Sequence, residues 1–104
     1  MKRTYDVYGT SGELISAANR VSDALGIGLA LHSSDYLGGD YYRTPFPDDT
    51  VQIIRNADDD PDELPYEQYA QYAIIVEVNE SPRADEYQEK LVAAGFDHLE
   101  REII

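Results

Sequence analysis

Histidine, serine and aspartate stand together at residues 32–35, and these are residue types that could do catalytic chemistry. In a Ser-His-Asp triad, the histidine takes a proton from the serine that attacks the substrate. The fold usually assembles such a triad from distant parts of the chain, and no Gly-x-Ser-x-Gly turn exposes a serine here. On a strand, His32 and Ser33 point to opposite faces. The sequence therefore predicts no catalytic residue and a protein that is not an enzyme.

Acidic residues at 58–63 resemble a calcium-binding loop in composition only. The EF-hand pattern requires glycine at its sixth position and glutamate at its twelfth, where this chain has Glu63 and Tyr69. The chain has no cysteine, and His32 and His98 are its two histidines, so no zinc-ligand spacing occurs. We therefore expect no metal.

Glycines at 9 and 12 precede the first predicted helix, in the segment Gly9-Thr10-Ser11-Gly12. Backbone N–H groups at such a position favour an anion. The segment lacks the lysine of a phosphate-binding loop and the glycine spacing of a dinucleotide site. We therefore expect no nucleotide and no cofactor. The same observations argue less strongly against a small carboxylate ligand at this segment.

Charge is the strongest compositional signal, because 21 acidic and 8 basic residues give a formal net charge of −13. Residues 58–104 carry 14 acids and 3 bases, whereas residues 1–57 carry 7 acids and 5 bases. A negative field repels nucleic acid and anionic membranes, and it steers cationic partners inward. The alternative is that the charge serves solubility alone.

The chain offers no membrane segment in its sequence pattern. No apolar run approaches the roughly 20 residues that a membrane helix needs. The basic N-terminus lacks the apolar region of a secretory signal. Together with the absence of cysteine, these features indicate a cytoplasmic protein.

Hydrophobic periodicity and chain breakers predict two helices. Leu14, Ala18, Val21 and Leu25 share one face of a helix over residues 11–25, which Gly26 ends. The second helix is predicted to begin at Ser81-Pro82 and to end at Gly95.

Six strands are predicted from alternating or short apolar runs. They cover residues 4–8, 27–32, 40–44, 51–55, 73–79 and 97–104. On the fifth, Ile74, Val76 and Val78 should face the core, and Ile75 should lie on the other face beside Glu77.

This order of elements predicts one α+β domain over residues 1–104, since the length suits one domain. Two helices each join a pair of strands, so we expect a ferredoxin-like or related split β-α-β fold. Its antiparallel sheet should carry both helices on one face and leave the other face open.

Tyrosine is unusually frequent, with 9 Tyr against 2 Phe and no Trp. Tyrosines alternate with carboxylates at 35–42 and again at 58–72. Carboxylates can replace the phosphates of a nucleic acid and rings can replace its bases, so such a surface suits the cleft of a nucleic-acid-cleaving enzyme. We therefore predict that a basic protein binds these residues: Asp35, Tyr36, Asp40, Tyr41, Tyr42, Asp58, Asp59, Asp60, Asp62, Glu63, Tyr66, Glu67 and Tyr69. By strand alternation, one of Tyr41 and Tyr42 should face inward.

In size, acidity, α+β pattern and the segment SSDYLGGDYYR at 33–43, the chain resembles the small acidic immunity proteins of bacterial toxin–immunity systems. The resemblance implies a cytoplasmic inhibitor that occludes the active site of a cognate basic toxin, for example a nuclease. No toxin-contacting residue carries over by position. The alternative is a regulatory domain similar to the ACT type, with a small ligand near the turn at Gly9–Gly12.

Overall fold

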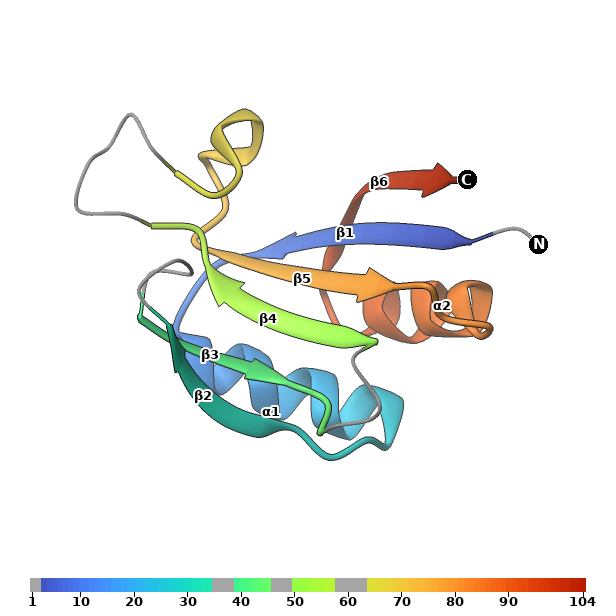
Figure 1. Ribbon diagram of the computed structural model, residues 1–104, viewed down its shortest axis with the longest axis horizontal. Coiled ribbons are helices and arrows are strands. Elements are labelled where there is room, and N and C mark those ends of the chain that lie inside the picture. The colour runs from blue at the N-terminus through green and yellow to red at the C-terminus, as the bar shows by residue number, and fades with distance from the viewer. Residues whose placement is uncertain (1–2, 35–38, 46–49, 58–63) are drawn as a thin grey trace.

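The protein is described here from a computed structural model, which describes residues 3–34, 39–45, 50–57 and 64–104 (Figure 1). The predicted residues Asp35, Tyr36, Asp58, Asp59, Asp60, Asp62 and Glu63 lie outside these ranges. The elements along the chain are β1 (Thr4–Thr10), α1 (Leu14–Leu25), β2 (Ala30–Ser34), β3 (Gly39–Arg43), β4 (Val51–Arg55), the 3-10 turn η2 (Glu67–Tyr69), β5 (Ile74–Asn79), α2 (Ala84–Ala93) and β6 (Asp97–Ile103).

One six-stranded sheet holds all these strands, in the order β2-β3-β4-β5-β1-β6, and every neighbouring pair is antiparallel. Strand β1 lies between β5 and β6, so β5, α2 and β6 form a split β-α-β unit. Strands β1 and β2 also run in the same direction, with β5, β4 and β3 between them. The predicted α+β class is confirmed, and the topology is compatible with a ferredoxin-like or related split β-α-β fold.

Both helices cover one face of the sheet (Figure 1). The apolar stripe of α1 is buried at Leu14, Ala17, Ala18, Val21 and Leu25, which confirms the predicted face. These side chains and those of α2 pack on Tyr8, Ile53 and Val76 of the sheet. Neither described helix has the length and apolarity needed to cross a membrane.

Helix α1 begins at Leu14, later than the predicted residue 11. The reason is that β1 extends through Thr10, whose hydroxyl accepts a hydrogen bond from Arg20 Nη1 at 3.1 Å. The helix ends as predicted, because Gly26 has the left-handed φ of 66° and donates its N–H to the Ser22 carbonyl.

The opposite face of the sheet is partly covered instead of open. Val7, Ile54 and Ile75 form a second small apolar cluster there. The predicted division of β5 is confirmed, because Ile74, Val76 and Val78 lie in the main core and Ile75 lies in this second cluster.

Candidate functional site: a tyrosine and carboxylate face

Asn56, which follows β4, holds the segment 66–72 against the sheet. Its buried side-chain Nδ2 donates to the backbone oxygens of Tyr66, Tyr69 and Tyr72 at 3.1, 2.9 and 3.2 Å. Its Oδ1 accepts the backbone N–H of Tyr66 at 2.9 Å. An amide carries two N–H donors, so three carbonyls share them. One side chain thus fixes a segment that has little regular structure of its own.

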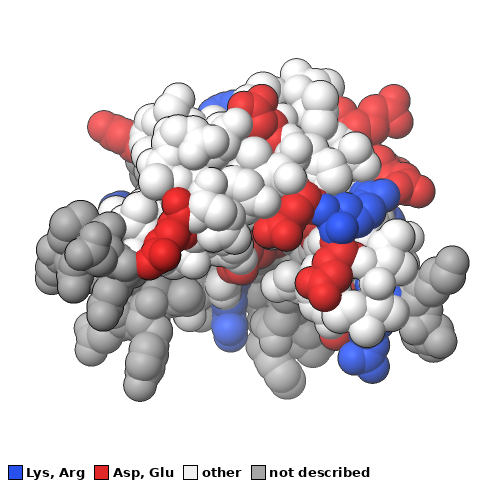
Figure 2. Space-filling view, turned by 90° about the horizontal axis from the view of Figure 1, so that it is seen from above, with Lys and Arg blue, Asp and Glu red and all other residues white. Residues whose placement is uncertain are grey.

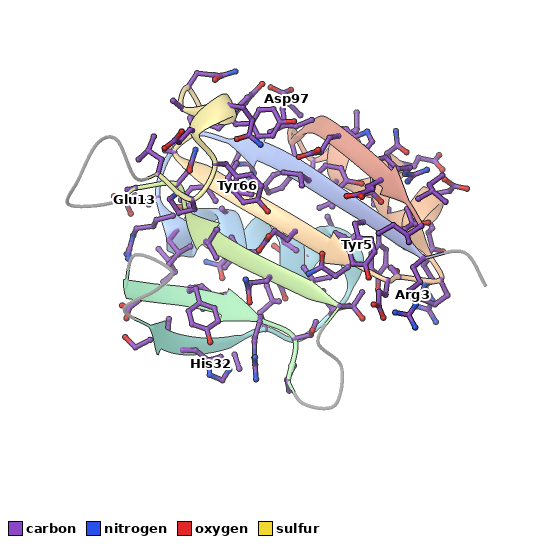
Figure 3. All side chains as sticks on the ribbon, turned by 45° about the horizontal axis from the view of Figure 1, so that its top comes forward. Arg3, Tyr5, Glu13, His32, Tyr66 and Asp97 are labelled. Atoms are coloured by element: carbon purple, nitrogen blue, oxygen red, sulfur yellow. The ribbon has the colours of Figure 1, made fainter. Side chains whose placement is uncertain are left out.

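The rings in this segment pack on the second apolar cluster. Tyr66, Tyr69 and Tyr72 contact it together with Tyr41 and Leu99. Tyr66 and Tyr69 stack with ring centroids 6.2 Å apart, and the ring of Tyr41 stacks on His32 at 5.5 Å. We call this helix-free side of the sheet, with Tyr5, Tyr41, Tyr66, Tyr69 and Tyr72, the tyrosine face. Figure 3 shows Tyr5, Tyr66 and His32 on the side of the sheet away from the helices.

Three tyrosine hydroxyls on this face each hold a carboxylate. The Tyr66 hydroxyl donates to Glu77, whose other oxygen accepts from Gln52 Nε2 at 2.9 Å. The Tyr72 hydroxyl donates to Asp97 Oδ2 at 2.8 Å. The Tyr5 hydroxyl donates to Glu80 Oε1 at 2.6 Å. The face therefore carries carboxylates in fixed positions beside half-exposed rings.

These contacts raise the pKa values of the tyrosines. Burial, followed by the hydrogen bond to Glu77, raises the pKa of Tyr66 well above its ordinary value. The hydrogen bond to Glu80 raises the pKa of Tyr5, and the bond to Asp97 raises that of Tyr72. Burial and the nearby Glu100 raise the pKa of Tyr69. At neutral pH the hydroxyls are neutral donors, as in any tyrosine of ordinary pKa, and the raised pKa values extend this state to more alkaline pH. The charge on this face comes from the carboxylates and from Arg3, whose Nη1 lies 3.4 Å from Glu80 Oε1.

The structure brings some of the predicted binding residues together and separates others. Tyr41, Tyr66 and Tyr69 share the tyrosine face, and Glu67 of η2 is exposed. Tyr42 instead packs against the main core on the helix-bearing side. Tyr41 and Tyr42 thus lie on opposite faces, as alternation predicts, and Tyr42 is the one that faces inward.

Several residues of the tyrosine face were missed from sequence. Asn56, Tyr5, Tyr72, Glu80 and Asp97 carry no local pattern that marks them. Glu77 did carry a signal, since the alternation of β5 placed it away from the helices. The other residues of this face come together only through tertiary contacts, because they lie on or next to β1, β4, β5 and β6.

A second polar cluster lies under α2. The side chain of Asp6, fully buried, accepts hydrogen bonds at Oδ1 from His98 Nε2 at 2.8 Å and from Arg101 Nε at 2.7 Å. Arg101 also donates to Asp6 Oδ2 at 3.2 Å and to Asp85 at 2.7 Å. The buried hydroxyl of Tyr8 has no hydrogen-bond partner among the described residues, and its ring lies 4.9 Å from that of His98. This cluster joins β1, β6 and α2.

A cavity of about 530 Å³ opens on the helix-bearing side at the start of α1. We call it the α1 groove. Its lining comes from the turn before α1, from α1 itself and from β2 to β5: Gly12, Glu13, Leu14, Ile15, Leu31, Asp40, Tyr42, Arg55, Ala57, Ala73 and Ile74. The turn at which a small ligand was considered from sequence thus forms one edge of a real cavity.

Among the described residues, no group of three or more histidine, cysteine or acidic side chains could hold a metal ion. Comparison of the chain with models of protein families, with curated proteins and with solved structures finds no match. The geometry of the tyrosine face and of the α1 groove is therefore the basis of the functional conclusions.

Proposed function

We propose that this chain is a binding protein that inhibits a basic protein partner through the tyrosine face, in the manner of an immunity protein that occludes the active site of its toxin. The observation that supports it best is the set of carboxylates that tyrosine hydroxyls hold in place: Glu77, Glu80 and Asp97.

A held carboxylate suits recognition of a cationic partner. Each carboxylate has about four acceptor sites, so accepting one or two internal bonds leaves sites for an incoming arginine or lysine. The neighbouring tyrosines offer large rigid contact area with few rotatable bonds. Since the side chains are already ordered, binding loses less conformational entropy than it would with free surface acids.

The overall charge supports fast association with such a partner. A net charge of −13 steers a cationic protein toward the surface. Figure 2 shows acidic side chains spread across the side that bears η2 and β6, with fewer basic ones among them. Close charge pairs across an interface of this kind couple by about 1.5–7 kcal/mol.

The proposal has a direct test. The probe is the C-terminal domain of a secreted protein encoded beside this chain, if that domain is toxic when expressed in the cytoplasm. Co-expression of the chain should restore growth, and the purified pair should associate faster at low salt. Replacement of Asp58, Asp59, Asp60 and Asp62 by Asn should slow association and weaken its salt dependence.

A matched control separates position from total charge. Replacement of four exposed acids on the helix-bearing side, Asp23, Asp85, Glu86 and Glu89, by their amides removes the same formal charge. It should change the association rate less than the 58–62 variant does. Equal effects from both variants would assign the rate to net charge alone, and a toxic domain that neither binds nor is neutralised would end the proposal.

A further inference from the structure

We propose that the α1 groove binds a small amphipathic carboxylate, an apolar body with one carboxylate group, and that the guanidinium of Arg55 receives the carboxylate. This site lies on the helix-bearing side of the sheet, away from the tyrosine face. It therefore stands or fails separately from the inhibitor function.

The groove has the size and the surface of a ligand site. Its volume of about 530 Å³ falls within the range of small-molecule pockets, roughly 300–1,000 Å³. Two of its large apolar side chains stay in contact with water, Ile15 at 55% exposure and Leu31 at 57%. They come from different elements, α1 and β2, and line the same cavity as the buried Ile74. An apolar ligand would remove both from solvent.

Arg55 is placed to receive an anion in this groove. It ends β4 and shares a face with Val51 and Ile53, which both lie in the main core. Its side chain is half-buried and lines the groove, yet no hydrogen-bond or ion-pair partner for it occurs within the described ranges. In contrast, Arg101 contacts two carboxylates. A planar guanidinium binds a carboxylate with two parallel hydrogen bonds.

The other charged residues of the groove limit the ligand to one negative group. Glu13 and Asp40 also line it, and both are exposed. Asp40 accepts a hydrogen bond from the Ser33 hydroxyl at 2.8 Å. A second negative charge on the ligand would meet these two acids, because like charges at short range repel. The groove thus favours a monocarboxylate over a phosphate monoester.

The test is an amide NMR titration of the isotope-labelled full chain with 3-phenylpropionate. We expect saturable shifts in the millimolar range at Gly12, Glu13, Ile15, Leu31 and Arg55. The neutral alcohol and the amine of matched length, and phenyl phosphate, should bind about tenfold more weakly or worse, because each lacks a favourable charge pair or adds a repulsive one.

Two variants test separately which residues contact the carboxylate of the ligand and which contact its apolar body. R55Q should weaken binding of 3-phenylpropionate about tenfold or more, since it removes a charge-assisted pair. L31N should weaken it severalfold by removing apolar contact. The controls R83Q and V92N change exposed residues that do not line the groove, and they should bind as the parent does.

The same spectra report whether each variant is folded, because a folded chain keeps its dispersed amide signals. Unchanged affinity in R55Q, tighter binding of the amine than of the carboxylate, or shifts confined to other surfaces would overturn the proposal. So would the absence of any saturable shift in the parent chain.

Discussion

Arg101 binds the buried carboxylate of Asp6 with two hydrogen bonds, from Nε to Oδ1 at 2.7 Å and from Nη2 to Oδ2 at 3.2 Å. The two residues face each other across β1 and β6. Their bonds, followed by the one to Asp85, raise the pKa of Arg101 above its ordinary value. This pair fixes the edge strand β6 to the centre of the split β-α-β unit.

Substitution of Asp6 by Asn should destabilise the fold by about 3–5 kcal/mol, because it leaves a guanidinium without its buried counter-charge. Urea unfolding followed by circular dichroism measures the change. As a control, Asp85→Asn removes the outer carboxylate, whose side chain is 93% exposed, and should cost less than about 1 kcal/mol. Similar losses of unfolding free energy in both variants would show that the buried Asp6 stabilises the fold no more than the exposed Asp85 does.

Substitution of Asn56 by Ala should cost about 2–3 kcal/mol and loosen the segment 66–72, because three partly buried carbonyls lose their donor. Hydrogen exchange should accelerate at the Tyr66 amide, which Asn56 holds directly. Asn79→Ala, a half-buried asparagine on β5, serves as the matched control and should change stability by less than about 1 kcal/mol. An unchanged exchange rate in the Asn56 variant would show that ring packing alone holds the segment.

Gly9 leaves room for the ring of Tyr72. A Cβ atom at this position would lie 2.5 Å from Tyr72 Cγ and 3.0 Å from Leu99 Cδ1. Gly9→Ala should therefore destabilise the fold by about 1–3 kcal/mol through overpacking. Gly28→Ala, where nothing lies within 4 Å of such an atom, should be nearly neutral in the same thermal or urea melts. Equal stability of the two variants would contradict the close packing of Tyr72 on β1.

Stability should fall at alkaline pH. The pKa values of Tyr5, Tyr66, Tyr69 and Tyr72 are raised in the folded state above about 10, the value in an unfolded chain. Below about pH 10 both states are protonated and the stabilisation is complete. Above it the unfolded chain ionises first, so the free energy of unfolding decreases as pH rises toward the folded pKa values.

Tyr66→Phe isolates one part of that effect. It should lower stability at neutral pH by about 1 kcal/mol, since Glu77 loses a donor, and it should make the alkaline decrease less steep. Urea unfolding at about pH 8 and about pH 11 measures both quantities. A decrease as steep as in the parent chain would exclude Tyr66 as a contributor.

Tyr41 and Tyr42 should respond oppositely to truncation. If the inhibitor function holds, Tyr41→Ala should weaken the complex by about 2 kcal/mol or more, because Tyr41 lies on the tyrosine face. Tyr42→Ala should instead lower the stability of the free chain by about 1–3 kcal/mol, because its ring packs on the main core. Calorimetric binding and urea melts of the two variants, side by side, separate the effects. The reverse pattern would place the binding surface on the other side of the sheet.

Local patterns were enough to predict most of the fold. The apolar stripe of α1, the stop at Gly26 and the alternation along β5 act within a few residues, so they can be read without knowing the partners. Strand β4 was predicted with its observed bounds of Val51 and Arg55. Together these local patterns predicted the α+β class and showed which residues of β5 lie on each face of the sheet.

The candidate sites depend on contacts between distant residues. Tyrosine was predicted from sequence to bind a partner, but its carboxylate partners within the chain were not predicted. Tyr66 meets Glu77 only when its segment folds back over β5, and Tyr72 meets Asp97 only when β5 and β6 flank β1. Likewise, Asn56 looks like an ordinary loop residue until its amide meets the carbonyls of the segment 66–72.

The sequence by itself therefore determined the order and type of the helices and strands, the fold class and the acidic, tyrosine-rich composition, although β2, α1 and α2 begin two or three residues later than predicted. Only the tertiary structure decided that Tyr42, and not Tyr41, faces the main core, that Asp6 is paired with Arg101, and that Arg55 lines a groove. The physical reason is range: helix and strand preferences arise from near neighbours, whereas a site arises from strand order and register, which depend on the packing of the whole sheet.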